Sequence, residues 1–195
     1  MKKNNNVSAF LSLSSRGGSR VVPNYDKLVA LLQQHAPKNL DWRSSIFNKE
    51  TNTSQGLPSL SYALKSLFSD MYLASDSPIV NAGIKSIQSY YQQLSANKYG
   101  YAISSEIALR DLGYALLRED NVKKALEVFN INLKSYPDSP HVYAAMAWAL
   151  AEDNNLTDAL SMRKMAYKLA RKQKSAYESY YKQLLTDLDN KMSAN

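Results

Sequence analysis

The sequence contains no cysteine among its 195 residues. This absence excludes disulfide bonds, thiolate metal sites and a cysteine nucleophile. No apolar run is long enough to span a membrane, and the N-terminus does not read as a signal peptide. We therefore expect a soluble protein, with its compartment left open. The sequence also lacks Gly-x-Ser-x-Gly, a glycine-rich phosphate loop and any His/Asp/Glu cluster with metal-ligand spacing. We expect no metal and no cofactor.

Two histidines are the only candidate imidazole bases in the sequence. We expect His35 to be exposed at a helix end, where it interacts with the carboxyl end of that helix. His141 follows Pro140 in the first turn of a helix, and we expect it on the surface. Because they belong to separate segments, neither is predicted to be catalytic.

The formal charge is +7 and the isoelectric point is near 9.4. Much of the excess lies near the C-terminus, on Arg163, Lys164, Lys168, Arg171, Lys172, Lys174 and Lys182. Such a patch would suit nucleic acid or an anionic surface. Because no nucleic-acid motif accompanies it, we favour the solvated face of terminal helices, and nucleic acid stays the weaker alternative.

The N-terminal segment, 1–57, predicts a strand–helix–strand unit. Val7–Ser14 alternates apolar and small polar residues, as strands do, and a turn at 15–20 follows. Pro23 and Asn24 then open a helix, and Leu40–Phe47 reads as a second strand. The helix has an apolar stripe of Leu28, Leu31 and Leu32. Such a βαβ unit is parallel, and two strands alone leave exposed edges that could favour a homo-oligomer.

The remaining segment, 58–195, predicts a helical array. Pro58 suits a helix first turn, and that helix carries a stripe of Leu60, Leu64, Leu67 and Phe68. Ser77 and Pro78 open the next helix, with Ile79, Ile84, Ile87, Tyr91 and Leu94. The last helix has a stripe of Tyr177, Tyr180, Tyr181, Leu184, Leu185 and Leu188, which is predicted to cover the end of the array.

Segments 105–139 and 140–173 repeat one pattern. Small residues recur where two helices of a hairpin must approach closely, at Gly113 and Ala125 and then at Ala147 and Ala159. The pattern resembles the tetratricopeptide repeat in its helix–turn–helix unit and in its period of about 34 residues. The second copy departs from the repeat because Arg163 replaces a late aromatic residue and Arg171 replaces the closing proline.

The N-terminal half of the chain carries a second resemblance. The strand with Phe10 to Leu13, the helix from Tyr25 and the segments 48–54 and 57–68 are similar to the late part of α/β-hydrolase putative esterases. This group is related to esterase D and the siderophore esterases, and some bacterial members carry a helical repeat tail. The resemblance implies a catalytic histidine where this chain has Asn52. An amide cannot take and return a proton near neutral pH, so we expect no activity from the chain alone.

The sequence therefore predicts a mainly α fold of tetratricopeptide-like antiparallel hairpins, with a small βαβ remnant of an α/β-hydrolase sheet. The favoured function is a non-catalytic module for protein interaction or scaffolding. Its partner would be a protein, a peptide or the catalytic domain of an esterase. Candidate contacts on the first helices of the repeats are Arg110, Tyr114, Arg118 and Trp148. One alternative for Tyr114 and Trp148 is that both rings simply pack between helices. A separate alternative for the whole chain is a fragment or subunit of a serine esterase whose nucleophile lies on a missing or separate N-terminal segment.

Overall fold

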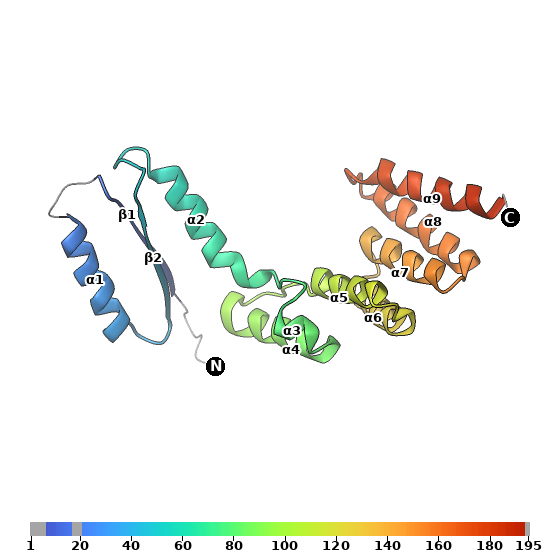
Figure 1. The fold of residues 1–195 in the computed structure, drawn as a ribbon, viewed down its shortest axis with the longest axis horizontal. Coiled ribbons are helices and arrows are strands. Elements are labelled where there is room, and N and C mark those ends of the chain that lie inside the picture. Colours follow the sequence, from blue (N-terminus) through green and yellow to red (C-terminus); the bar gives the residue numbers. More distant parts are fainter. Residues whose placement is uncertain (1–6, 17–20, 194–195) are drawn as a thin grey trace. The chain divides into compact units, whose positions relative to one another are not determined.

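The structure is a computed structural model that describes residues 7–16 and 21–193. Within that part the chain is mainly helical, with one two-stranded parallel sheet (Figure 1). Its contacts divide it into two compact units, Met1–Tyr72 and Leu73–Asn195. Of the turn predicted at 15–20, Ser15 and Arg16 form a turn and 17–20 lie outside the described residues.

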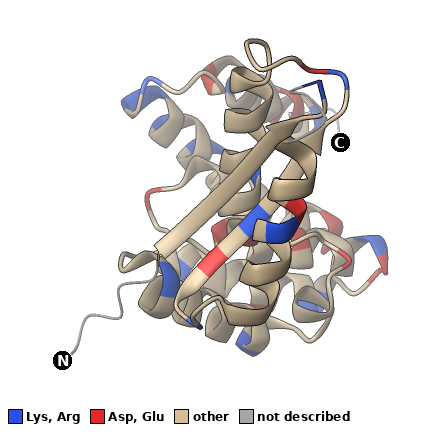
Figure 2. Ribbon diagram, turned by 90° about the vertical axis from the view of Figure 1, so that its left-hand side faces the viewer, with Lys and Arg blue, Asp and Glu red and all other residues tan. Residues whose placement is uncertain are grey.

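The first unit is built on two parallel strands, β1 (Val7–Ser14) and β2 (Leu40–Phe47). Both have the predicted bounds, and Val7 lies opposite Leu40 in the register. Helix α1 (Val21–His35) connects them, and α2 (Gly56–Phe68) follows β2. Figure 1 shows these two helices on opposite sides of the strands. The charged residues of the strands are Asp41 and Arg43 on β2, which pair at 2.6 Å (Figure 2).

Only part of the leucine stripe predicted for α1 packs against the sheet. Leu28 and Leu31 are 44% and 56% exposed. The less exposed side of the helix instead carries Val22, Tyr25, Val29 and Leu32. The Tyr25 hydroxyl donates a hydrogen bond to the Leu11 carbonyl, which holds this side against β1. A sheet of two strands covers a narrow strip of the helix, so leucines beside the strip stay in solvent.

Helix α2 also leaves much of its predicted stripe open. Leu60, Leu64 and Phe68 are 57%, 47% and 41% exposed. Tyr62 instead lies against both strands, with its ring 5.4 Å from Phe10 and 6.1 Å from Phe47. This helix therefore groups with the sheet by its contacts, although the sequence pattern placed it at the start of the helical array.

The second unit runs from α3 (Pro78–Asn81) and α4 (Ile84–Leu94), through a π-helical turn at Ser95–Tyr99, to five longer helices. These are α5 (Glu106–Arg118), α6 (Val122–Ser135), α7 (Pro140–Glu152), α8 (Leu156–Lys172) and α9 (Glu178–Ser193). The prediction of one helix across Ile79 to Leu94 is wrong, because Gly83 takes a left-handed φ of 88° between α3 and α4. The predicted Ser77 cap is confirmed, since its hydroxyl accepts from the Val80 amide.

Each of the longer helices packs on the next along the chain. Leu109, Ala125 and Phe129 are fully buried in clusters that lie between successive helices. A Cβ on Gly113 would lie 2.3 Å from Cε1 of Phe129, so the predicted close approach of α5 and α6 is confirmed. The described helices include none that is both long and apolar enough to cross a bilayer.

Three of these helices end in the same way. Asp120, Asn154 and Lys174 have left-handed φ angles of 59°, 60° and 51° after α5, α7 and α8. In each case the next amide donates to a carbonyl five positions back, as Asn121 does to Leu116 at 2.8 Å. This is the Schellman motif, which satisfies the last carbonyls of a helix. Asparagine and aspartate tolerate the left-handed conformation better than lysine does.

Candidate functional site

A large hollow of the second unit is a groove lined by α5, α7 and the start of α9. One part has a cavity volume of ≈ 760 Å³, and a neighbouring part of ≈ 490 Å³ shares Tyr114 with it. We call both parts together the groove. The residues that line it from α5 and α7 include four pairs at equivalent positions of the two repeats: Ile107 and His141, Arg110 and Ala144, Tyr114 and Trp148, Arg118 and Glu152. The sequence repeat therefore recurs in the groove itself.

The four residues singled out from the sequence all lie on the groove. Arg110 lines its first part, Arg118 and Trp148 line the second, and Tyr114 lines both. Arg110, Tyr114 and Arg118 follow one another at helical (i, i+4) spacing, so the three lie along one face of α5. The structure thus brings together side chains that were predicted from two separate helices.

Tyr114 and Trp148 form an aromatic ledge. Their rings are 5.9 Å apart in an edge-to-face arrangement, and Tyr114 also contacts the buried Phe129 at 5.5 Å. Trp148 is 49% exposed, and its indole Nε1–H donates to Oε1 of Glu152 at 3.0 Å. Tyr114 therefore packs between helices and lines the groove as well, whereas Trp148 presents half of its surface to solvent with a fixed ring orientation.

At the other end of the groove, His141 joins α7 to α9. Its Nδ1 lies 2.5 Å from the Tyr181 hydroxyl, and its ring lies 5.5 Å from that of Tyr177. His141 was expected on the surface; it lines the groove, and these tyrosines half-bury it. Burial lowers the pKa of His141, the charge of Arg110 lowers it further, and Glu106 opposes both. Burial also raises the pKa of Tyr181 to about 12. Both shifts favour the neutral forms of the two side chains.

Arg163 of α8 lies close to the groove tyrosines. It lies 34 residues after Phe129 in the sequence, and its Nε is buried without a hydrogen-bond partner among the described residues. Burial lowers the pKa of its guanidinium, whereas Tyr180, Tyr114 and Asp187 act in the opposite direction. Such an unpaired buried donor is uncommon in folded proteins.

Three further groove residues, His141, Tyr177 and Tyr180, were not predicted from the sequence. For His141 the sequence did hold a signal. It lies 34 residues after Ile107, so the repeat period places the two residues at equivalent positions of α7 and α5. The stripe on α9 predicts packing for its tyrosines, but Tyr177 and Tyr180 are 56% and 54% exposed. Tyr181, the third tyrosine of that stripe, is buried, as predicted for a helix that covers the array.

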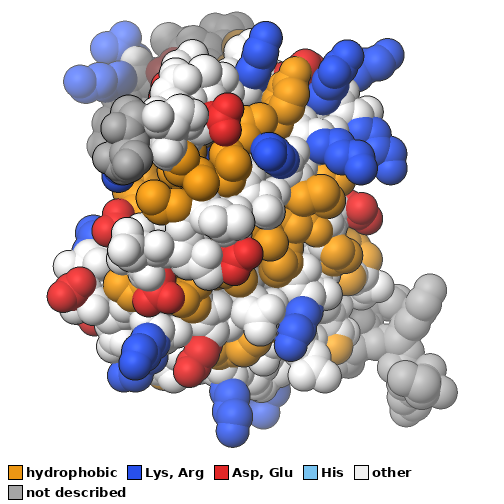
Figure 3. Space-filling model, turned by 90° about the vertical axis from the view of Figure 1, so that its right-hand side faces the viewer, with side chains coloured by type: hydrophobic (Ala, Val, Ile, Leu, Met, Phe, Trp, Pro, Cys, Tyr) orange, Lys and Arg blue, Asp and Glu red, His pale blue; other side chains and the backbone are white. Residues whose placement is uncertain are grey.

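The other members of the basic stretch, Lys164, Lys168, Arg171, Lys172, Lys174 and Lys182, are exposed. Figure 3 shows one face on which hydrophobic side chains form bands, with many Lys and Arg side chains near its upper edge. Arg163 therefore differs from the rest of the stretch, because it is partly buried and close to Tyr180.

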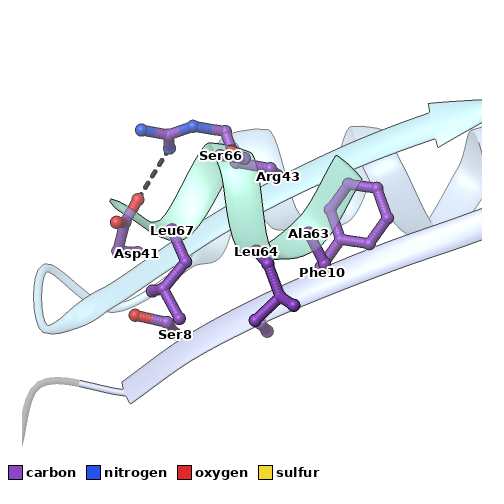
Figure 4. Close-up of a pocket in the computed structure, with 9 residues that line it drawn as sticks. Ser8, Phe10, Asp41, Arg43, Ala63, Leu64, Ser66 and Leu67 are labelled. Carbon is purple, nitrogen blue, oxygen red and sulfur yellow. Dashed lines mark hydrogen bonds and ion pairs between the residues drawn. The ribbon is translucent and has the colours of Figure 1, made fainter. Parts of the chain in front are cut away.

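A smaller cavity of ≈ 180 Å³ lies in the first unit, between α2 and the strands. Figure 4 shows Phe10 and Leu64 beside it, with Arg43 and Asp41 at one side. These two charges form an ion pair at 2.6 Å, and the remaining lining is mostly apolar. This cavity offers little polar chemistry and is the weaker candidate site.

The described residues contain no serine–histidine pair of the kind that a serine esterase uses. Asn52, at the position where the esterase resemblance implies histidine, lies on an exposed turn. Nearby, the Ser54 hydroxyl donates to Oε2 of Glu50. His35 is exposed in the last turn of α1, and in the described part of the chain no serine hydroxyl bonds to either histidine. The described residues also contain no group of three His, Cys, Asp or Glu that could hold a metal ion.

Comparison with protein-family models, curated proteins and solved structures gave no match. Function is therefore inferred from the geometry of the groove.

Proposed function

We propose that the second unit is a tetratricopeptide-like helical module that binds an extended segment of a partner protein in the groove. The supporting observation is that positions of α5 and α7 that lie 34 residues apart in the sequence line two neighbouring hollows, which share Tyr114. Concave faces of stacked helical repeats typically receive extended peptides or neighbouring domains. The exposed rings of Trp148, Tyr177 and Tyr180 supply apolar contact area with polar edges, which is typical of binding surfaces.

The repeat assignment itself is part of this proposal. Its support is the close contact of Gly113 with Phe129, the full burial of Ala125, Ala147 and Ala159, and the shared Schellman ends of α5 and α7. With two copies, the array is short of the three repeats usually needed for stability. In this proposal α4 and α9 supply the missing neighbours, through packing on α5 and α8 respectively.

The test is a selection of random linear dodecapeptides displayed on phage against the full chain. Clones should be retained by the wild-type chain and lost on Trp148→Ala and on Tyr114→Ala/Trp148→Ala. Tyr101→Ala is the matched control, since Tyr101 is 57% exposed and does not line the groove. Circular dichroism checks that each variant is folded. A selection that yields no clone dependent on Trp148 would overturn the proposal.

A second candidate function is favoured by the parallel pairing of β1 and β2. In the described residues each of these strands has one edge without a strand partner. We propose that the first unit derives from the last strands of an α/β-hydrolase sheet, whose catalytic residues would be supplied by other strands. Turnover of a short-chain chromogenic ester by the chain, lost on substitution of one of its own residues, would favour this candidate over a non-catalytic module.

A further inference from the structure

Two guanidinium groups act on the phenol of Tyr114 from different helices. Burial raises the pKa of Tyr114, and the charges of Arg110 on α5 and Arg163 on α8 both act to lower it. Within the described ranges, neither of these two arginines forms an ion pair with a carboxylate, in contrast to Arg43 with Asp41. Arg110, which lines the groove, and Arg163, which lies close to its tyrosines, therefore both lack a direct counter-ion near Tyr114.

Arg110 is a groove residue whose side chain can only donate hydrogen bonds. Arg110 and the hydroxyls of Tyr114 and Tyr180 have no hydrogen-bond partner in the part of the chain that the structure describes. The nearby carboxylates are partly engaged. Glu106 accepts from the Ser139 hydroxyl at 2.7 Å, and Glu152 accepts from Trp148. Because a guanidinium has no acceptor site, Arg110 can be satisfied only by a ligand that presents an acceptor.

Asp111 is the exception among the carboxylates. Burial raises its pKa, and the charges of Arg110 and Arg118 lower it. It also acts on Tyr91 of α4, so it lies toward the α4 side of α5. The Asp111 carboxylate offsets part of the charge of Arg110 and Arg118. It can also accept a hydrogen bond from a backbone N–H of a bound peptide. Arg118 also lines the groove beside Glu152, which leaves Arg110 as the better anchor for an added anion.

The spacing of the lining residues matches an extended chain. Arg110 and Tyr114 are one turn apart, which corresponds to about 6 Å along the α5 axis. Alternate side chains of an extended peptide point the same way and are about 6.6 Å apart. A side chain held at Arg110 therefore places the side chain two residues away at the ledge of Tyr114 and Trp148.

We infer that the groove selects an extended peptide with an acidic residue at Arg110 and a large apolar residue two positions away, against Tyr114 and Trp148. This inference rests on the proposed function and names the chemistry of the partner. The carboxylate accepts from the guanidinium of Arg110, which pairs well with carboxylates in a fork geometry. The net charge of +7 on the chain favours the approach of an acidic segment.

The experiment uses the dodecapeptides that require Trp148 for capture. An acidic residue two positions from a large apolar one should be enriched among them. In a synthetic copy of one such peptide, with both ends blocked, Asp or Glu changed to its amide should lower the affinity about tenfold or more. Arg110→Ala should cause a similar loss and should no longer distinguish the acid from the amide. Lys168→Ala, on the exposed side of α8, is the matched control and should change nothing.

Three outcomes decide the inference. Enrichment together with the loss on Arg110→Ala supports it. Clones that depend on Trp148 but show basic, proline-rich or unpatterned sequences overturn it and leave the proposed function intact. The absence of any clone that depends on Trp148 overturns both. Arg110→Glu gives a second check, because this variant should prefer the same peptide with Lys in place of its acid.

Discussion

Gly113 permits a close approach between α5 and α6, and Gly113→Ala should test that contact directly. An added Cβ would lie 2.3 Å from Cε1, 2.5 Å from Cζ and 2.8 Å from Cδ1 of Phe129. Phe129 is fully buried, and its ring also contacts Tyr114. Relief of the overlap requires the ring to move by about 1 Å to reach ordinary van der Waals separation, inside a close-packed core.

Two opposing effects decide whether Gly113→Ala lowers or raises the free energy of unfolding. Alanine is favoured over glycine inside a helix by about 1 kcal/mol. Overpacking of a core typically costs about 1–3 kcal/mol and occasionally more. Because the overlap involves three ring atoms of a residue that cannot move into solvent, we expect the upper part of that range. The net prediction is a free energy of unfolding that is lower by about 1–2 kcal/mol, the difference between these two effects.

The measurement is urea unfolding followed by the fluorescence of Trp148 in a Trp42→Phe background. Trp42 lies in the first unit, so the signal then reports on the second unit. Phe129→Leu in combination with Gly113→Ala should cost less than the sum of the two single changes. Gly56→Ala, where a Cβ meets nothing within 4 Å, is the control by circular dichroism and should be neutral or stabilising. Equal or greater stability of Gly113→Ala would refute the reasoning.

Three further predictions concern the helix ends and His141. Lys174→Gly should stabilise the chain by about 0.5–1 kcal/mol in urea unfolding, because it removes a left-handed lysine; a loss would contradict the cap assignment. Asn155→Ala should cost about 1 kcal/mol in the same assay, because the Asn155 side chain accepts from the Asp158 amide, and unchanged stability would exclude this cap. Since the pKa of His141 is lowered on folding, the unfolded chain binds more protons just below pH 6.5, so stability should fall with acidification through that range. His141→Gln should show a smaller fall between about pH 7 and 5, and an unchanged slope would refute the assignment.

The strands and the later helices could be predicted from the sequence because local pattern and tertiary contact agree there. Val7–Ser14 and Leu40–Phe47 both have the predicted bounds. The small residues at Gly113 and Ala125 are likewise buried at a helix contact. Where the local sequence pattern and the tertiary contacts disagree, the prediction failed. Leu28 is apolar, but the narrow sheet reaches another side of α1.

The candidate site could be predicted in part for the same reason. Arg110, Tyr114, Arg118 and Trp148 follow from helical spacing within a repeat, which fixes the face on which each lies. The contribution of Tyr177 and Tyr180 could not be derived this way, because it depends on how α9 packs against the helices before it. A stripe of apolar and aromatic residues does not say which of them remain in solvent. The partial burial of Arg163 could not be derived either, since it also depends on the position of α9.

The contact boundary after Tyr72 has a consequence for how this chain can be altered. Every residue that lines the groove comes from the portion beyond that boundary. The groove and the two strands are therefore encoded in separate stretches of the sequence. Evolution or an experimenter could exchange the stretch that ends at Tyr72 for another fold and keep the same recognition surface. The proposed peptide specificity would then be transferable to an unrelated protein by fusion.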